Sequence, residues 1–179
     1  MTEHHYSLVP FPDPAPPGII VSGRIAREHE KLAVYFSLTG NCEEVLIPAS
    51  ASRPGRRDQL WTETCFEFFL AIRDQPQYWE FNLSPSGNWN AYRMDAYRRV
   101  GFREEMSIEQ LQVEVLKNGD CISAAVSVEL SQIIPAGEII QVGVASVIQT
   151  RSGQETYWAL AHPAPYPDFH LKNSFLLQL

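Results

Sequence analysis

The stretch that most constrains the fold runs from Trp61 to Arg98, where apolar and polar side chains alternate along three segments. The segments are 62–72, 78–84 and 89–94, and the turn sequences RDQPQ and SPSGN separate them. Successive side chains on a strand point to opposite faces, so this alternation predicts strands with one apolar face. The other face carries acids, an amide and phenols, namely Glu63, Glu67, Tyr78, Glu80, Asn82 and Tyr92.

Further strand and turn signals occur along the rest of the chain. Hairpins are predicted for 19–26 with 32–38, for 111–117 with 121–130 across Asn118-Gly119, and for 139–149 with 156–160. Shorter strands are expected at 44–48 and 174–179, with one helical turn at 130–134. About ten or eleven short strands without a long helical period predict an all-β fold. The expected form is an antiparallel immunoglobulin-like or jelly-roll β-sandwich.

The length and composition favour a single folded domain with an extended N-terminal segment. The chain has 179 residues, of which 45% are hydrophobic, enough to bury a full core. We expect residues 1–18 to form a Pro-rich arm packed on the domain and residues 19–179 to form the sandwich. The alternation assigns Phe66, Phe68 and Leu70 to the core, with Trp79 and Phe81 beside them on the next strand.

Charge and terminal sequence exclude several classes of partner. The net charge of −7 argues against nucleic acid and anionic membranes, and the basic run RPGRR at 53–57 is predicted to be a solvated loop. No apolar run approaches the roughly 18 residues of a membrane span. The N-terminus lacks the cationic and apolar regions of a signal peptide, so a cytoplasmic location is expected. Cys42, Cys65 and Cys121 lack metal-ligand spacing, which favours reduced thiols.

The polar strand face and the nearby tryptophans suit a ring-shaped polar ligand such as a sugar. Trp61, Trp89 and Trp158 lie near predicted strand ends, where an aromatic plane can stack on a sugar ring. The alternative for all three is packing at the edge of the sandwich. Trp79 alternates with Phe81 and is predicted to belong to the core.

Glu67 and Glu80 should lie on the same face of adjacent strands, where directly opposed residues are about 5 Å apart. Two carboxyl groups at such a spacing can serve a retaining glycosidase as nucleophile and acid. They can equally contact a ligand or remain solvated. Arg98 follows the turn after the third strand, and its guanidinium can bind vicinal hydroxyls or a carboxylate, or pair with Glu67 or Glu80.

The segment AHPAPYPDFH holds His162, Asp168 and His170, whose spacing can bind a metal. Its prolines and aromatic residues also fit a rigid loop, and this is the simpler interpretation. The chain has no nucleophile elbow, phosphate loop, zinc helix or redox cysteine pair.

Three blocks carry a resemblance to a known family: LWTETCFEFFL, YWEFNLSPSGNWNAYRMDAYR and YWALAHPAPYPDFH. Together they resemble the DOMON-like domains related to family 9 carbohydrate-binding modules, in particular small stand-alone bacterial versions, many of them cyanobacterial. The similarity runs over residues 5–179. It implies an immunoglobulin-like sandwich in which two aromatic planes clamp a terminal sugar, and relatives of this kind can hold structural calcium.

Carried over to this chain, the resemblance implies that Trp61 and Trp158 are the two aromatic planes and that Glu67, Asn82 and Arg98 supply polar contacts. The broader superfamily also contains haem-binding domains with Met and His axial ligands. The candidates for such a pair in this chain are Met94 and His162.

The sequence therefore predicts a binding module that is not an enzyme, with a small saccharide or similar polar ligand on one sheet face. The alternatives are a glycoside-processing enzyme, a haem-binding electron carrier and a scaffold that binds only protein. Neither nucleic acid nor membrane is expected as a partner. The predicted ligand-binding residues are Trp61, Glu67, Glu80, Asn82, Tyr92, Arg98 and Trp158.

Overall fold

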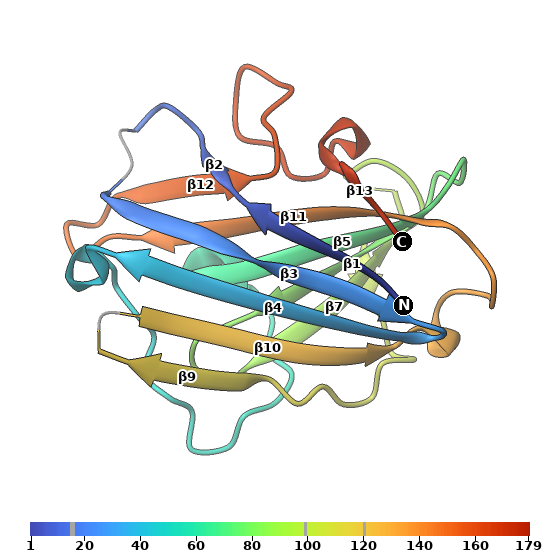
Figure 1. Cartoon of the computed structure of the whole chain (residues 1–179), viewed down its shortest axis with the longest axis horizontal. Coiled ribbons are helices and arrows are strands. Elements are labelled where there is room, and N and C mark those ends of the chain that lie inside the picture. Colours follow the sequence, from blue (N-terminus) through green and yellow to red (C-terminus); the bar gives the residue numbers. More distant parts are fainter. Residues whose placement is uncertain (15–16, 99, 120) are drawn as a thin grey trace.

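Two antiparallel sheets pack face to face in the computed structural model, which describes residues 1–14, 17–98, 100–119 and 121–179 (Figure 1). In spatial order, the five-stranded sheet consists of β1 (Thr2–Ser7), β3 (Ile19–Glu28), β4 (Lys31–Gly40), β10 (Cys121–Glu129) and β9 (Glu114–Asn118). Its antiparallel neighbours are joined by short hairpins at β3–β4 and β9–β10, as the turn signals predict.

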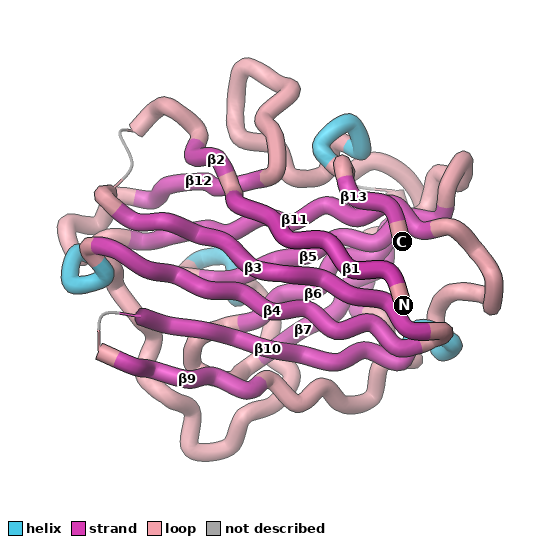
Figure 2. Tube along the Cα trace, in the orientation of Figure 1, coloured by secondary structure: helices cyan, strands magenta, loops and turns pink. Residues whose placement is uncertain are grey.

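The second sheet has eight strands. Its spatial order is β2 (Val9–Pro10), β12 (Glu155–Ala159), β11 (Ile140–Gln149), β5 (Cys65–Ile72), β6 (Tyr78–Leu83), β7 (Trp89–Met94) and β8 (Arg103–Glu104), and β13 (Leu177–Gln178) also pairs with β11. The fold class predicted from the sequence, an antiparallel β-sandwich, is confirmed. Strand dominates the described chain, as Figure 2 shows.

Helical structure among the described residues is confined to 3₁₀ turns. These are η1 (Cys42–Glu44), η2 (Leu60–Thr62), η3 (Leu130–Gln132) and η4 (Lys172–Ser174). Within the described ranges there is no helix with the length and apolar character needed to cross a membrane.

The core lies between the two sheets and is almost entirely apolar. Phe66, Phe68 and Leu70 of β5 face it, as predicted, and the ring of Phe66 stacks on Phe36 of β4 across the sandwich at 5.0 Å between centroids. Phe68 stacks on Phe81 of β6 at 4.5 Å. Such rings each bury a large apolar surface, so this layer contributes most of the hydrophobic stabilisation.

Several local predictions need correction. The strand expected at 44–48 is instead the 3₁₀ turn η1 followed by a single bridge from Val45 to Thr150. The segment predicted as an arm contributes β1 to the five-stranded sheet and β2 to the eight-stranded sheet. Residues 1–10 therefore contribute strands to both layers of the sandwich.

The basic run at 53–57 is not a simple solvated loop, because Arg56 is tied into the fold. Its guanidinium lies over the ring of Trp89 at 4.5 Å and donates to the Asn90 side chain at 2.6 Å. It also donates to the backbone oxygens of Glu105 and Ile108. Trp89 belongs to the buried core, so the prediction that its ring could receive a sugar is wrong.

The outer face of the eight-stranded sheet is covered by chain, which is unusual for an antiparallel sheet at a protein surface. Phe175, from the C-terminal segment, packs over this face against Phe69 and Tyr78. Gly143 of β11 makes room for it, since a Cβ at that position would lie 2.5 Å from the Phe175 ring. The covering segments leave a hollow over β5 and β6.

Candidate ligand-binding site

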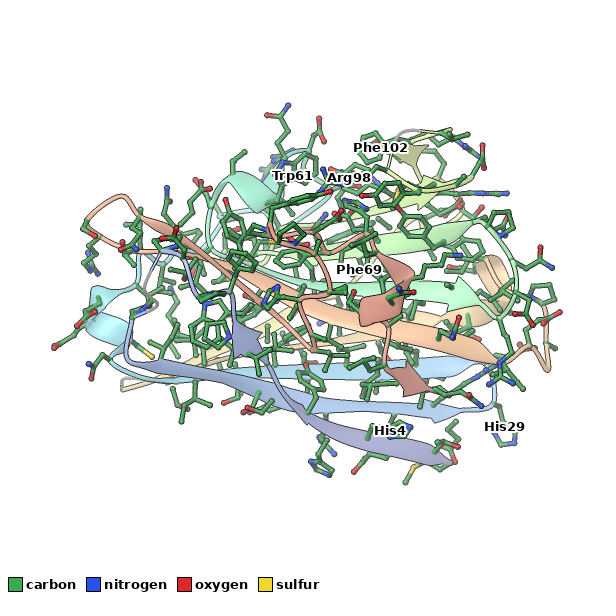
Figure 3. The ribbon with its side chains drawn as sticks, turned by 90° about the horizontal axis from the view of Figure 1, so that it is seen from above. His4, His29, Trp61, Phe69, Arg98 and Phe102 are labelled. Carbon is green, nitrogen blue, oxygen red and sulfur yellow. The ribbon has the colours of Figure 1, made fainter. Side chains whose placement is uncertain are left out.

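A cavity of about 420 Å³ lies between the outer face of the eight-stranded sheet and the segments that cover it. This volume is within the range of small-molecule sites. The floor comes from the strands and includes Glu67 of β5, Glu80 of β6 and Val147 of β11. Aromatic side chains form most of the walls, and they are Trp61, Phe102, Tyr157 and Phe169. Figure 3 shows Trp61, Arg98 and Phe102 together, on the side of the molecule opposite His4 and His29.

Trp61 reaches the cavity from η2, immediately after Gln59, whose φ of 59° lies in the left-handed region. The Trp61 ring packs edge-on against Tyr92 at 5.6 Å, and Tyr92 stacks on Phe102 at 4.9 Å. Tyr92 is buried, and its hydroxyl donates to Asp58 at 2.7 Å. Tyr92 therefore supports the two wall rings from behind and does not itself line the cavity.

Arg98 reaches the cavity from the loop between β7 and β8 and is held by its own backbone and by Asp168. Its φ is 55°, a left-handed conformation, and its amide donates to the Tyr78 hydroxyl at 3.2 Å. The guanidinium contacts one Asp168 oxygen at 3.2 Å from Nε and 3.1 Å from Nη2. Arg98 therefore pairs with Asp168 and not with Glu67 or Glu80, the two protein partners considered from the sequence.

Asp168 organises the part of the C-terminal segment that borders the cavity. Its buried carboxylate accepts hydrogen bonds from the Tyr97 hydroxyl and from the backbone amide of His170, in addition to Arg98. Burial alone would raise the pKa of Asp168, but these hydrogen bonds outweigh burial and lower it. The group is therefore ionised at neutral pH and holds Arg98 in place.

The register of β5 and β6 makes Glu67 and Glu80 diagonal neighbours. Glu67 lies opposite Asn82, and Glu80 lies opposite Phe69. The two acids share a face, as predicted, but the expectation that they lie directly opposite each other is wrong. Diagonal positions are typically about 7–8 Å apart at the backbone, a distance that two glutamate side chains can bridge.

Both carboxyl groups are buried and resist ionisation. Glu67 is 3% exposed and Glu80 is 4% exposed. Burial raises the pKa of Glu67 well above its usual range, and the nearby Glu80 raises it further. Burial likewise raises the pKa of Glu80 to about 7, although the Asn82 amide donates to its Oε1 at 2.8 Å and opposes the rise. The pair therefore holds at least one proton near neutral pH.

His170 completes the polar side of the cavity. Its Nδ1 lies 2.9 Å from the Tyr78 hydroxyl and its Nε2 lies 3.9 Å from a Glu80 oxygen. Burial and the positive charge of Arg98 lower the pKa of His170 to about 4, although Asp168 acts in the opposite direction. The imidazole is therefore neutral at pH 7.

The structure brings four of the seven predicted ligand-binding residues to the cavity and places three elsewhere. Trp61, Glu67, Glu80 and Arg98 line it. Asn82 is fully buried and holds Glu80, and Tyr92 lies behind the wall rings. The prediction for Trp158 is wrong, because its ring is 3% exposed in the core between the sheets and its Nε1 donates to Thr156 at 3.1 Å.

The neighbour of Trp158 takes the role that the sequence assigned to Trp158. Tyr157 points to the opposite face of β12 and lines the cavity. A shift of one residue along a strand exchanges the two faces, so the choice between adjacent aromatic residues depends on register. Phe102, Phe169 and His170 are further lining residues that were not predicted as ligand contacts, and they come from covering loops whose path no local pattern defines.

The metal and haem alternatives are not assembled by the fold. His162 lies beside β2, where its Nε2 contacts the Val9 oxygen at 3.0 Å, away from Asp168 and His170 at the cavity. No group of three or more potential metal ligands occurs in the parts of the chain that the structure describes. Met94 is buried on β7, five strand positions from β2, a separation on the order of 20 Å. One iron cannot take both Met94 and His162 as axial ligands.

Comparison with known proteins finds solved structures with a similar fold. No protein-family profile matches the chain. No curated protein matches it. Among solved structures, a protein from Bacteroides uniformis assigned as carbohydrate-binding matches 96% of this chain and 83% of its own, with a TM-score of 0.72 and 15% identity.

Two structures of a family 9 carbohydrate-binding module from Caldicellulosiruptor kristjanssonii also match. The complex with cellotriose has a TM-score of 0.57 and 12% identity, and covers 89% of this chain and 74% of its own. The complex with glucose has a TM-score of 0.51 and 14% identity, and covers 81% and 69%. At such low identity these matches establish the fold. The predicted resemblance to family 9 modules is confirmed at that level.

Proposed function

We propose that this chain is a non-catalytic module that binds a small saccharide in the cavity over β5 and β6. The observation that carries the proposal is a cavity that combines aromatic walls with a buried carboxyl group whose hydrogen-bonding capacity is unused. Glu67 Oε1 is inaccessible to solvent and has no hydrogen-bond partner within the described structure. A buried polar atom without a partner is costly, and Glu67 lines the cavity, where a ligand hydroxyl can bond its carboxyl group.

The walls fit the apolar faces of a sugar ring. Trp61 and Phe102 are positioned on one side through Tyr92, and Tyr157 and Phe169 contribute further rings. Aromatic planes bury the C–H surfaces of a pyranose while polar groups bond its hydroxyls. The complexes of the similar family 9 module contain cellotriose and glucose, which supports a saccharide as the ligand of this chain.

Tryptophan fluorescence can test the proposal because the four tryptophans differ in exposure. Trp79, Trp89 and Trp158 are each at most 3% exposed in the core, whereas Trp61 is partly exposed at the cavity. A saccharide that binds in the cavity should therefore change the emission of Trp61 in a saturable way. Titration with a panel of mono- and disaccharides measures this change.

Trp61→Ala should abolish the fluorescence change and weaken the binding of the same saccharide, measured by calorimetry, by roughly tenfold or more. Tyr35→Ala is a matched control, since Tyr35 is a partly exposed aromatic residue of β4 on the other sheet. Equal affinity in wild type and Trp61→Ala, with the fold intact, would refute a stacking site at Trp61.

A second candidate function, glycoside hydrolysis, is favoured by one observation. The buried Glu67–Glu80 pair retains a proton near neutral pH, and a retaining glycosidase requires one protonated and one ionised carboxyl group. Release of nitrophenol from a panel of nitrophenyl glycosides separates the two functions. Turnover that disappears in Glu67→Gln and in Glu80→Gln would establish an enzyme, whereas saturable binding without turnover supports a binding module.

A further inference from the structure

Among the residues that the structure describes, no cation pairs with the acidic groups on the floor of the cavity. No lysine or arginine of the described chain forms an ion pair with Glu67 or Glu80. Arg98, the guanidinium that lines the cavity, is already bound to Asp168. The nearest imidazole, His170, is held neutral by burial. The site therefore has unused capacity for a positive charge.

The described structure supplies few hydrogen-bond donors to the two carboxyl groups on the floor. Glu67 Oε1 has no partner, and Glu80 receives one amide hydrogen bond, at Oε1 from Asn82. An ammonium group offers three N–H donors and a full positive charge, so it can bond both carboxylates at once. A neutral hydroxyl offers a single donor and brings no positive charge to the pair.

The walls suit a cation as well as a ring. Trp61, Tyr157 and Phe169 border the same cavity, and aromatic faces attract a nearby cation most strongly where water is displaced. Glu155, also on the wall, adds a further carboxylate that accepts the Tyr157 hydroxyl at 2.8 Å. The described surroundings of the floor are therefore acidic and aromatic, and the Arg98 guanidinium that lines the cavity is already paired with Asp168.

We infer that the ligand of this cavity is an amino sugar, a small saccharide whose protonated amino group binds between Glu67 and Glu80 while its ring lies against Trp61. The inference rests on the proposed saccharide-binding function and narrows its ligand class. The ammonium ion replaces the missing counter-charge, and the remaining hydroxyls face Arg98 and His170.

Binding of this kind is linked to protons. An ammonium ion favours the ionised carboxylates, so the complex forms with release of protons from the pair near neutral pH, and the affinity falls as the pH drops below about 7. The titratable and charged groups that face the pair come from β5, β6, β12 and the covering loops. They are Cys65, Tyr78, Arg98, Glu155, Asp168 and His170.

The test is calorimetry on the whole chain at pH 7 with matched ligand pairs: glucose and glucosamine, galactose and galactosamine, mannose and mannosamine. In at least one pair the amino sugar should bind roughly tenfold or more tightly than its neutral partner, and its N-acetyl derivative, which has no charge, should lose that gain. Repeating the titration in buffers of different ionisation enthalpy should reveal the released protons.

Glu67→Gln keeps the size of the side chain and removes the charge, so it should reduce the preference for the amino sugar to about threefold or less. Glu80→Gln serves as the second variant, and thermal unfolding checks that both fold. Glu28→Gln, at an exposed carboxylate of β3 on the other sheet, should leave the preference unchanged.

Each remaining outcome identifies which proposal fails. If neutral sugars bind as tightly as amino sugars in every pair, or if N-acetylation has no effect, the amino-sugar inference is overturned and saccharide binding stands. If cyclohexylamine binds as tightly as the best amino sugar, the hydroxyls contribute nothing, and both proposals fail. If no sugar of either kind binds, both the proposed function and this inference are wrong.

Discussion

Both faces of β5 and β6 in the eight-stranded sheet are buried, but only the outer face also buries carboxyl groups. Every residue of β5 is buried. Phe66, Phe68 and Leu70 enter the apolar core between the sheets, whereas Glu67 and Phe69 alternate with them on the outer face beneath the covering loops. Burial alone therefore does not separate core from site. Core and site differ in whether the buried groups are apolar or polar, and in whether the buried polar groups have hydrogen-bond partners.

The inner face buries apolar groups, which stabilises the fold, whereas the outer face buries a polar atom that has no hydrogen-bond partner within the described structure. Stacked rings such as Phe68 and Phe81 lose only contact with water when they are buried. A carboxyl group such as Glu67, with an oxygen that nothing bonds, loses hydration without compensation. Natural proteins tolerate such departures mainly where function requires them. The contrast therefore supports a binding site on the outer face.

The largest expected effect is on the inner face. Phe68→Ala removes a stacked ring from the core and should lower the free energy of unfolding by about 3–5 kcal/mol, measured by urea denaturation. Binding per folded molecule should be unchanged, since the ring does not line the cavity. A loss below about 1 kcal/mol would mean that the inner layer is not the main source of stability. It would contradict the contrast drawn between the inner and outer faces.

A smaller effect is expected where the covering segment is anchored. Asp168→Asn removes the charge that holds Arg98 and weakens the acceptor for the Tyr97 hydroxyl, so stability should fall by about 1–3 kcal/mol. The Arg98 side chain is 43% exposed, so solvent screening limits the ion-pair share of this loss. Urea denaturation gives the loss, and calorimetry should show weaker saccharide binding.

Asp95→Asn is the matched control for the anchor. Asp95 also pairs with an arginine, Arg103, at 3.0 Å, but its side chain is 44% exposed and away from the cavity lining. This variant should change stability much less than Asp168→Asn does and leave saccharide affinity unaltered. If Asp168→Asn proves as mild as this control in both measurements, the covering segment does not depend on Asp168 for its position.

The sequence alone predicts the inner face better than the outer one. Alternation identifies Phe66, Phe68 and Leu70 as core because one strand and one period define which way they point. It also brings Glu67 and Glu80 to one face, since both belong to strands with clear patterns. Diagonal placement of the pair depends on the β5–β6 register, which no local signal defines.

The cavity walls are least predictable because they come from loops. Phe102, Phe169 and His170 meet only when the covering segments fold over the sheet, and such long-range contacts leave no period in the sequence. Trp158 and Tyr157 illustrate the same limit within a strand, since adjacent aromatic residues on a short strand can be exchanged by one step of register. The sequence therefore shows that an aromatic residue of this strand can line the cavity, but not whether it is Tyr157 or Trp158.

The last expected effect is a gain of stability on the outer face, and it depends on pH. Burial raises the pKa of Glu80 from 4.5 to about 7, so between these values the folded state binds more protons than the unfolded state and loses stability as the pH rises. Glu80→Gln removes this loss. The variant should therefore gain stability relative to wild type as the pH increases from 4.5 to about 7, measured by urea denaturation at several pH values.

Comparing the two proteins at each pH separates the contribution of the Glu67–Glu80 pair from that of His170. His170 has a pKa lowered to about 4, so its own contribution rises with pH between 4 and 6.5 and opposes the Glu80 effect in the wild-type curve. Because His170 is present in both proteins, the difference curve cancels most of its contribution. A difference that stays flat or falls with pH would mean that Glu80 is stabilised as a carboxylate in the free protein. The outer face would then hold a carboxylate whose hydrogen bonds are already made within the protein, which would argue against a ligand-binding site there.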